Sequence, residues 1–336
     1  MKIVIEKLLG NQNLTQKESQ DVMFKIMSGK FDDAQIAGFL IALRSKGETS
    51  EEIAGFAEAM REKMTPIPII CDAIDMCGTG GDASGTFNIS TAASFVVAGA
   101  GVSVAKHGNR SMSSKSGSAD VLESLGVNIT LPPERIAKCI DDIGLGFMFA
   151  PTLHPAMKHA VGARNSLAVR TVFNILGPLC NPAKVKRQVI GVFDGKITEK
   201  MATVLQLLHS EEAYILHGRD GLDEITTTSD TEVWEVRGGR IRNYSLAPED
   251  GGIERTTLSE IQAKSVEEHQ SLFVAALGDR ECAARDIVLL NTGAALVVAG
   301  KAADLRSGVS TAREAISGGQ ALEKLDRLAR LTQELE

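Results

Sequence analysis

The ten residues AIDMCGTGGD, from Ala73 to Asp82, decide how this 336-residue chain folds. Ala73–Met76 is a short, mostly apolar run that predicts a buried strand, and the glycine-rich segment Gly78–Asp82 follows it directly. A helical pattern begins near Ala92. Because a strand, a glycine-rich turn and a helix start follow in this order, the segment predicts an α/β fold that binds an anion through backbone N–H groups.

The region after this segment alternates between short apolar runs and helical patterns. The predicted strands are Ala73–Met76, Val102–Ala105, Gly146–Ala150, Gln188–Val192 and Ala213–Leu216. The predicted helices include Ala92–Gly99, Ala119–Leu125, Glu134–Ile143, His154–Leu167 and Glu199–His209. Glu232–Val236 and Arg240–Tyr244, on either side of Gly238-Gly239, predict a hairpin. This alternation predicts an α/β fold with a mostly parallel central sheet flanked by helices.

The first 65 residues have helical patterns only. Three residue pairs match the capping box that starts a helix, namely Thr15 with Glu18, Asp32 with Gln35, and Thr49 with Glu52. Pro66 and Pro68 end this region and mark a candidate hinge. We therefore expect a small all-helical N-terminal domain over residues 1–66, joined by part of 165–183, and a large α/β domain over residues 67–336.

The composition favours a folded protein, with 43% hydrophobic residues and 32 glycines. A net charge of −7 argues against nucleic acid and against acidic membranes as partners. The five cysteines form no CxxC pair, so we expect reduced thiols. The charged N-terminus MKIVIEKLLG is unlike a signal peptide, and no run of about 18 uncharged apolar residues predicts a membrane span.

The loop after the first strand predicts a phosphate or pyrophosphate cradle. Its residues are Gly78-Thr79-Gly80-Gly81-Asp82, and Asn88, Ser90 and Thr91 follow where a helix starts. The glycines expose backbone N–H groups, and the helix N-terminus adds about half a positive charge. The loop is not the GxxxxGK[ST] type, because no lysine follows the glycines. The alternative is a plain tight turn in which Ser90 only caps the helix.

A second loop follows the next strand and combines fixed positive charges with hydroxyl groups. It runs through Lys106-His107-Gly108-Asn109-Arg110 and continues from Ser111 to Ser118, where a helix starts. These side chains could bind the same anion as the first loop. The alternatives are a solvated basic turn and, for Ser118, a helix cap.

The third loop, Ala150–Pro155, brings a histidine to the edge of the predicted sheet. His154 lies near the start of a predicted helix that also carries Arg164. A histidine in this position is equally typical of a capping or packing role. The loop alone therefore leaves the function of His154 open.

The fourth loop, Gly218–Glu224, carries the adjacent acids Asp223 and Glu224. Mg²⁺ near phosphates is typically held by one or two carboxylates together with water and phosphate oxygens. The pair therefore predicts a magnesium site, provided that the backbone is irregular enough to turn both side chains to one side. The alternative is a solvated acidic turn.

Several motifs in these loops and beyond them carry a family resemblance. They are GTGGD at Gly78–Asp82, TFNIST at Thr86–Thr91, KHGNR at Lys106–Arg110, SSKSGSADVLE at Ser113–Glu123, FAPTLHPAM at Phe149–Met157, RTVFNILGPLCNP at Arg170–Pro182 and GLDEI at Gly221–Ile225. Together they resemble the anthranilate phosphoribosyltransferase family of tryptophan synthesis, over nearly the whole chain. GTGGD is shared with pyrimidine nucleoside phosphorylases, whereas KHGNR combined with HPAM and GPL-x-NP is far more specific.

The resemblance implies a site for phosphoribosyl pyrophosphate (PRPP) and for magnesium. The PRPP-binding residues it implies are Gly78, Gly80, Gly81, Asp82, Thr86, Asn88, Ser90, Thr91, Lys106 and Ser118. It implies Mg²⁺, with two ions expected, held by Ser90, Asp223 and Glu224. Lys106 is expected to stabilise the leaving group, and no residue is expected to form a covalent intermediate.

The resemblance also implies a pocket for anthranilate. The residues it implies are Gly78, Asn109, His154, Arg164 and Gly177. This chain departs from the family pattern beside that pocket, at three positions: Asn165 stands where a second basic residue is frequent, Ala168 where glycine is common, and Cys180 where threonine is usual.

The implied activity is transfer of the phosphoribosyl group of PRPP to the amine of anthranilate, by a cytoplasmic homodimer that contacts through its helical domains. Three alternatives remain: a pyrimidine nucleoside phosphorylase of the same fold, a phosphoribosyltransferase with another aromatic amine, and a non-catalytic binding paralogue. Intact Asp223, Glu224, Lys106 and His154 argue against the last of these.

Overall fold

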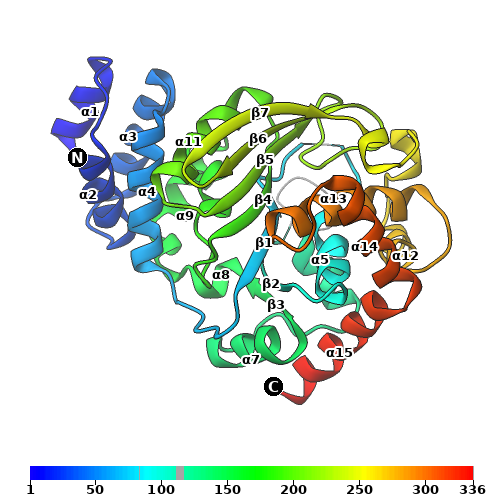
Figure 1. The fold of residues 1–336 in the computed structure, drawn as a ribbon. Coiled ribbons are helices and arrows are strands. Elements are labelled where there is room, and N and C mark those ends of the chain that lie inside the picture. Colours follow the sequence, from blue (N-terminus) through cyan, green and yellow to red (C-terminus); the bar gives the residue numbers. More distant parts are fainter. Residues whose placement is uncertain (83, 111–116, 336) are drawn as a thin grey trace.

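The computed structural model describes residues 1–82, 84–110 and 117–335. The N-terminal helices are α1 (Lys2–Leu9), α2 (Gln16–Met27), α3 (Asp33–Lys46) and α4 (Ser50–Lys63). All three predicted capping boxes are present, at the starts of α2, α3 and α4. Figure 1 shows these helices grouped at one side of the molecule, against the α/β part of the chain.

The sheet, within the described residues, contains seven strands in the order β3-β2-β1-β4-β5-β6-β7. Their bounds are β1 Ala73–Gly78, β2 Ser103–Gly108, β3 Leu145–Phe149, β4 Arg187–Gly191, β5 Glu212–Gly218, β6 Thr231–Arg237 and β7 Arg240–Leu246. The first five are parallel to one another, and the hairpin β6–β7 adds two antiparallel strands at one edge. The predicted fold class, a helical N-terminal part and an α/β part with a mostly parallel sheet, is confirmed.

The helices of the α/β part cover both faces of the sheet (Figure 1). They are α5 Ile89–Gly99, α6 Ser118–Ser124, α7 Pro133–Ile143, α8 Ala150–Leu153, α9 Lys158–Leu167, α10 Phe173–Leu176, α11 Thr198–Leu207, α12 Val266–Leu277, α13 Ala283–Val298, α14 Leu305–Ser317 and α15 Gln320–Glu334. Helices α5 and α13 pack together on one face, and α11 lies on the other, where it also contacts α4. None of the described helices is long and apolar enough to cross a membrane.

Two apolar cores lie on opposite faces of the sheet. Val189 belongs to the core beneath α5 and α13, whereas its neighbour Ile190 belongs to the core shared with the N-terminal helices. Alternating side chains of a strand point to opposite faces, so central strands buried on both faces are apolar almost throughout. Phe39 of α3 and Phe56 of α4 pack edge to face, 5.9 Å apart, in the second core. The helical region is thus joined to the sheet through a common core.

Several predictions were wrong at element ends: α5, for instance, starts at Ile89 and not at Ala92, and β1 ends at Gly78 and not at Met76. The strand around Phe147 ends at Phe149, and Ala150 begins the short helix α8. The helix predicted over His154–Leu167 is interrupted: a 3₁₀ turn occupies Pro155–Met157, and α9 starts only at Lys158. Pro155 is the physical reason, because a proline disfavours helical geometry in the residue before it. Strand β2 also continues past Ala105, so that Lys106 lies within the strand.

Candidate active site

The glycine-rich loop leaves the carboxyl end of β1 and is held by two neighbouring segments. The backbone N–H of Thr79 donates to the carbonyl of Gly191, the last residue of β4, at 2.9 Å. The N–H of Gly80 donates to Oδ2 of Asp223 at 3.0 Å. Gly80 and Gly81 both have positive φ angles, +68° and +81°, which only glycine adopts without strain. The sequence therefore has glycine where the tight turn requires it.

Two other glycines allow the acidic segment to approach the sheet closely. A Cβ atom on Gly78 would lie 2.4 Å from Oδ2 of Asp223, and one on Gly191 would lie 1.6 Å from the carbonyl oxygen of Asp223. Any larger residue at either position would push this segment away. Gly191 was not singled out from the sequence, because a glycine at the end of a strand has many ordinary explanations.

Ser90, Lys106 and Glu224 meet beside this loop. The backbone N–H of Ser90, in the first turn of α5, donates to Oε1 of Glu224 at 3.0 Å. Lys106 Nζ donates to Oγ of Ser90 at 3.3 Å and to the carbonyl of Met76 on β1. Lys106 is only 4% exposed, so its ammonium group is a fixed positive charge within the site. The structure thus brings together residues from three of the four predicted loops.

The two acids are partly buried, with too little positive charge nearby to compensate them. Burial, followed by the nearby charge of Asp82, raises the pKa of Asp223 to about 7. Burial, followed by the charge of Asp223, raises the pKa of Glu224 to about 8, although Lys106 acts in the opposite direction. Perturbed pKa values of this kind cluster at functional sites.

This excess of negative charge fits a divalent cation. Within the described part of the chain, no group of three or more His, Cys, Asp or Glu residues could hold a metal ion by itself. Asp223, Glu224 and the hydroxyl of Ser90 would therefore supply only part of a coordination shell. Mg²⁺ suits this arrangement, because it commonly keeps water and binds substrate phosphates beside one or two carboxylates.

The rest of the predicted PRPP residues line the same end of the sheet. Asp82 accepts hydrogen bonds from the backbone and hydroxyl groups of Ser84, and the Ser84 hydroxyl is 3.2 Å from Oγ1 of Thr86. Asn88 directly precedes α5, and Thr91 is buried in its first turn. On the second loop, residues 111–116 lie outside the described part of the chain.

A pair of buried histidines lies on the other side of Lys106. His107 of β2 and His154 approach each other through their Nε2 atoms, 3.2 Å apart. Burial lowers the pKa of His107 to about 3, with further lowering by His154 and Lys106. Burial lowers the pKa of His154 to about 4. Both rings are therefore neutral near pH 7. His107 was missed from the sequence, although it lies inside the KHGNR motif.

A buried carboxylate supports this pair from β1. Asp75 accepts a hydrogen bond from the backbone N–H of His107 at 3.2 Å and from Nδ2 of Asn181 at 2.8 Å. The same Asn181 nitrogen donates to the carbonyl of Ala105 at 3.0 Å. Asp75 and Asn181 were also missed, and an acid within an apolar strand was the signal that could have found the first.

The predicted acceptor residues occupy the border between the sheet and the helical region. Arg164, in the last turn of α9, lies over the ring of Phe173 at 5.2 Å. Gly177 begins a 3₁₀ turn soon after Phe173, and its backbone contacts His107. Asn109 follows β2, and its carbonyl accepts a hydrogen bond from Oγ of Ser118 at 3.2 Å. Asn109, His154 and Gly177 thus gather around the ends of β2 and β3.

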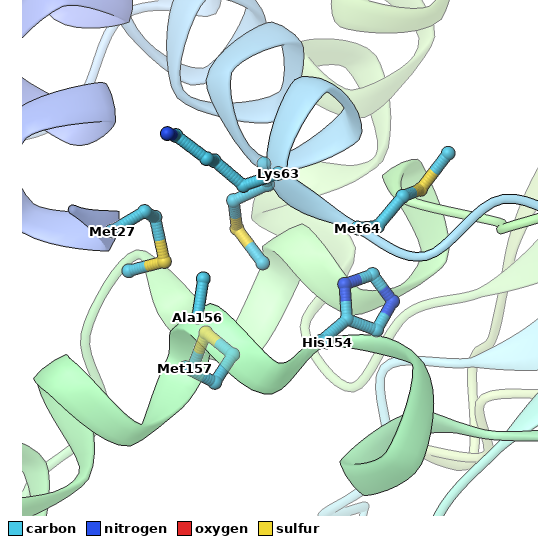
Figure 2. Close-up of a pocket in the computed structure, with 7 residues that line it drawn as sticks. Met27, Lys63, Met64, His154, Ala156 and Met157 are labelled. Atoms are coloured by element: carbon cyan, nitrogen blue, oxygen red, sulfur yellow. The ribbon is translucent and has the colours of Figure 1, made fainter.

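A shallow surface pocket adjoins His154 where the helical region meets the α/β part. Figure 2 shows side chains from both parts of the molecule facing each other there. The lining residues are Met27, Met60, Lys63, Met64, His154, Ala156 and Met157. The methionines are flexible and polarizable, so this contact can adapt its shape.

Arg170 reaches the glycine-rich loop from the segment between α9 and α10. Its Nη2 donates to the carbonyl of Gly81, and its guanidinium lies 3.9 Å from the ring centroid of Phe193. Its own carbonyl accepts a hydrogen bond from Nη1 of Arg44 on α3 at 2.6 Å. The sequence assigned no role to this arginine.

Comparison with known proteins supports a single family. Residues 71–322 match the glycosyl transferase family a/b domain, and residues 2–64 match the helical bundle domain of the same family. An anthranilate phosphoribosyltransferase of Cellvibrio japonicus is 50% identical over 341 residues, which cover 100% of this chain and 99% of that protein.

Solved structures agree with the sequence match. The crystal structure of anthranilate phosphoribosyltransferase from Thermus thermophilus superimposes with a TM-score of 0.93 at 40% identity, covering 98% of this chain and 99% of that one. The Saccharomyces cerevisiae enzyme in complex with PRPP and Mg has a TM-score of 0.90 at 27% identity, covering 98% and 97%. On this agreement over its full length, the chain belongs to the anthranilate phosphoribosyltransferase family.

Proposed function

We propose that this protein transfers the phosphoribosyl group of PRPP to the amine of anthranilate, giving N-(5-phosphoribosyl)anthranilate and pyrophosphate. One observation carries the proposal: the backbone of Gly80, the ammonium of Lys106 and the partly buried acids Asp223 and Glu224 meet at the carboxyl end of the sheet. The yeast relative that shares this fold binds PRPP and Mg.

The diphosphate of PRPP would lie against the glycine-rich loop and the N-terminus of α5. Among the described residues, the N–H groups of Gly81 and Asp82 donate to no protein acceptor, so they are available to phosphate oxygens. The helix N-terminus adds partial positive charge, and Lys106 adds a full one. The remaining proposed PRPP contacts are Gly78, Gly80, Thr86, Asn88, Ser90, Thr91 and Ser118.

Ser90, Asp223 and Glu224 would hold Mg²⁺, with two ions in the full site. When bound, the metal supplies positive charge that stabilises the departing pyrophosphate. Lys106 does the same from the protein side, because it is buried and fixed before the reaction begins.

Anthranilate would be bound by Asn109, His154, Arg164 and Gly177, with Gly78 at the end nearest the ribose. The planar guanidinium of Arg164, stacked on Phe173, is suited to a carboxylate and would orient the acid group. The neutral His107–His154 pair offers hydrogen bonds without adding charge. An arylamine is already neutral at pH 7, so its nitrogen needs no strong base, and its own carboxylate could take the proton.

The reaction would then depend mainly on positioning. Holding both substrates in line contributes several kcal/mol, on the order of what effective-molarity comparisons give. No covalent enzyme intermediate is required. Movement of the helical domain, residues 1–66 with part of 165–183, against residues 67–336 would close the site, with Pro66–Pro68 as the hinge. The homodimer through the helical domains and the cytoplasmic location also remain predictions.

A direct assay tests the activity. Purified protein, PRPP, Mg²⁺ and anthranilate should give a time-dependent loss of anthranilate fluorescence, and the loss should stop when EDTA is added. Glu224→Gln, which keeps the size of the side chain, should lose most of this activity. Phosphate-dependent cleavage of a pyrimidine nucleoside would contradict the proposal, and turnover of other aromatic amines with no turnover of anthranilate would change the acceptor.

A further inference from the structure

Arg170 is the only described side chain that donates to the carbonyl of Gly81, at the centre of the glycine-rich loop. The carbonyl and the N–H of a trans peptide unit point in opposite directions. Because Arg170 holds the Gly81 carbonyl on its own side, the N–H of Asp82 in the same peptide unit is directed to the other side. That N–H is one of the loop donors available to a phosphate oxygen.

The arginine is itself held from two sides. Its guanidinium lies over the ring of Phe193, which follows β4, at 3.9 Å. The backbone N–H of Phe193 donates to Oγ1 of Thr79 at 3.1 Å, so this ring is tied to the same loop. The carbonyl of Arg170 is held by Arg44 of α3 at 2.6 Å. Arg170 thus connects the helical region to the phosphate loop.

We propose that Arg170 is a positioning residue for the diphosphate: it orients the Gly81–Asp82 peptide unit, and Arg44 transmits the position of the helical region to it. The inference rests on the proposed function, because it concerns the same substrate. It adds a residue outside the set assigned above, and it predicts that the helical region also influences PRPP binding.

The test is a set of variants read out with PRPP and anthranilate separately. Arg170→Met removes the donor and keeps the length of the side chain, so the PRPP KM should rise about tenfold, the usual size for one lost charge-assisted hydrogen bond. The anthranilate KM should stay within about twofold. Arg170→Lys keeps a charged donor and should recover part of the loss.

Arg44→Met tests the connection to the helical region, because among the described residues the Arg44 side chain hydrogen-bonds only to the backbone of Arg170. The PRPP KM should rise about threefold, and the double variant should be no worse than Arg170→Met alone, since residues that act through one another are not additive. Arg242→Ala, an exposed arginine on β7, is the matched control and should change neither KM.

The outcomes separate this inference from the proposed function. If the unaltered protein binds no PRPP with Mg²⁺ in calorimetry, the proposed function fails. If the unaltered protein binds PRPP and the Arg170→Met variant binds PRPP equally well, the inference about Arg170 is overturned and the proposed function stands. If Arg170→Met raises the PRPP KM and Arg44→Met does not, Arg170 acts only through its own charge, and the connection to α3 is overturned. Strictly additive effects of the two substitutions on the PRPP KM would overturn the connection as well. An equal rise of both KM values would indicate general damage and would also overturn it.

Discussion

The Nε2 atoms of His107 and His154 lie 3.2 Å apart in a buried pair that joins strand β2 to the segment before α9. The two residues are 47 positions apart in the chain. Burial lowers both pKa values, so the pair is neutral while the enzyme works near pH 7. A neutral pair can hydrogen-bond an aromatic acid without competing with Arg164 for its charge.

The His107–His154 pair predicts that the folded protein loses stability at acidic pH. A histidine whose folded-state pKa lies below its unfolded value of about 6.5 binds its proton more readily in the unfolded chain. Stability should therefore fall as the pH drops below 6.5, by about 2 kcal/mol for each histidine at pH 5. His154→Gln should reduce the difference in unfolding free energy between pH 7 and pH 5, measured by urea denaturation. His209→Asn, which replaces an exposed histidine, should leave that difference unchanged.

Arg164 should contribute to the binding of anthranilate and not to the binding of PRPP. Arg164→Ala removes the proposed partner of the anthranilate carboxylate, so the anthranilate KM should rise at least tenfold, as expected for a charged hydrogen bond. PRPP binding, measured by calorimetry with Mg²⁺, should be almost unchanged. The exposed Arg135→Ala on α7 is the control. A large loss of PRPP affinity in Arg164→Ala would refute the assignment.

Because of Asp223 and Glu224, the stabilisation of the fold by Mg²⁺ should depend on pH. Raised pKa values mean that the metal-free folded protein binds more protons than the unfolded chain between about pH 4.5 and pH 8, so its stability falls as the pH rises through this window. Bound Mg²⁺ favours the ionised acids and offsets that loss. The increase in melting temperature caused by Mg²⁺ should therefore be larger at pH 8 than at pH 6.

The same reasoning gives the behaviour of Glu224→Gln. Without Mg²⁺ at pH 8, this variant should be at least as stable as the unaltered protein, because it lacks one of two partly buried acidic charges that lie side by side. Its melting temperature should rise less than that of the unaltered protein when Mg²⁺ is added. If the variant instead melts well below the unaltered protein in EDTA, Glu224 is a structural residue and the metal assignment is wrong.

Ala168 should be a strained position. It ends α9 with a φ angle of +48°, in the left-handed region, where the family resemblance implies a glycine. The left-handed conformation costs an alanine about 1 kcal/mol or more, and glycine adopts it freely. Ala168→Gly should therefore stabilise the fold by several tenths to about 1 kcal/mol, measured by urea denaturation.

A matched control makes this prediction specific. Ala275→Gly, at an exposed position within α12, should destabilise the protein by about 0.5–1 kcal/mol, because glycine is less favourable inside a helix. A loss of similar size at Ala168 would show that no strain is stored there.

Local patterns were enough to identify most elements. Thr15, Asp32 and Thr49 each cap the helix that was predicted from them, because a capping box involves residues only three positions apart. The parallel strands were recognised because their apolar runs are buried on both faces. Errors occurred where adjacent residues favour different local structures. At His154, the following Pro155 interrupts a pattern that otherwise predicts one continuous helix.

By itself, then, the sequence determined the helical N-terminal part, the alternating α/β part and the glycine-rich loop after β1. Only the tertiary structure decided that Asp223 packs against Gly78 and Gly191, that His107 meets His154, and that Arg170 holds Gly81. The reason is physical: helices, caps and turns depend on residues a few positions apart, whereas these contacts depend on which strands become neighbours and how closely two backbones approach.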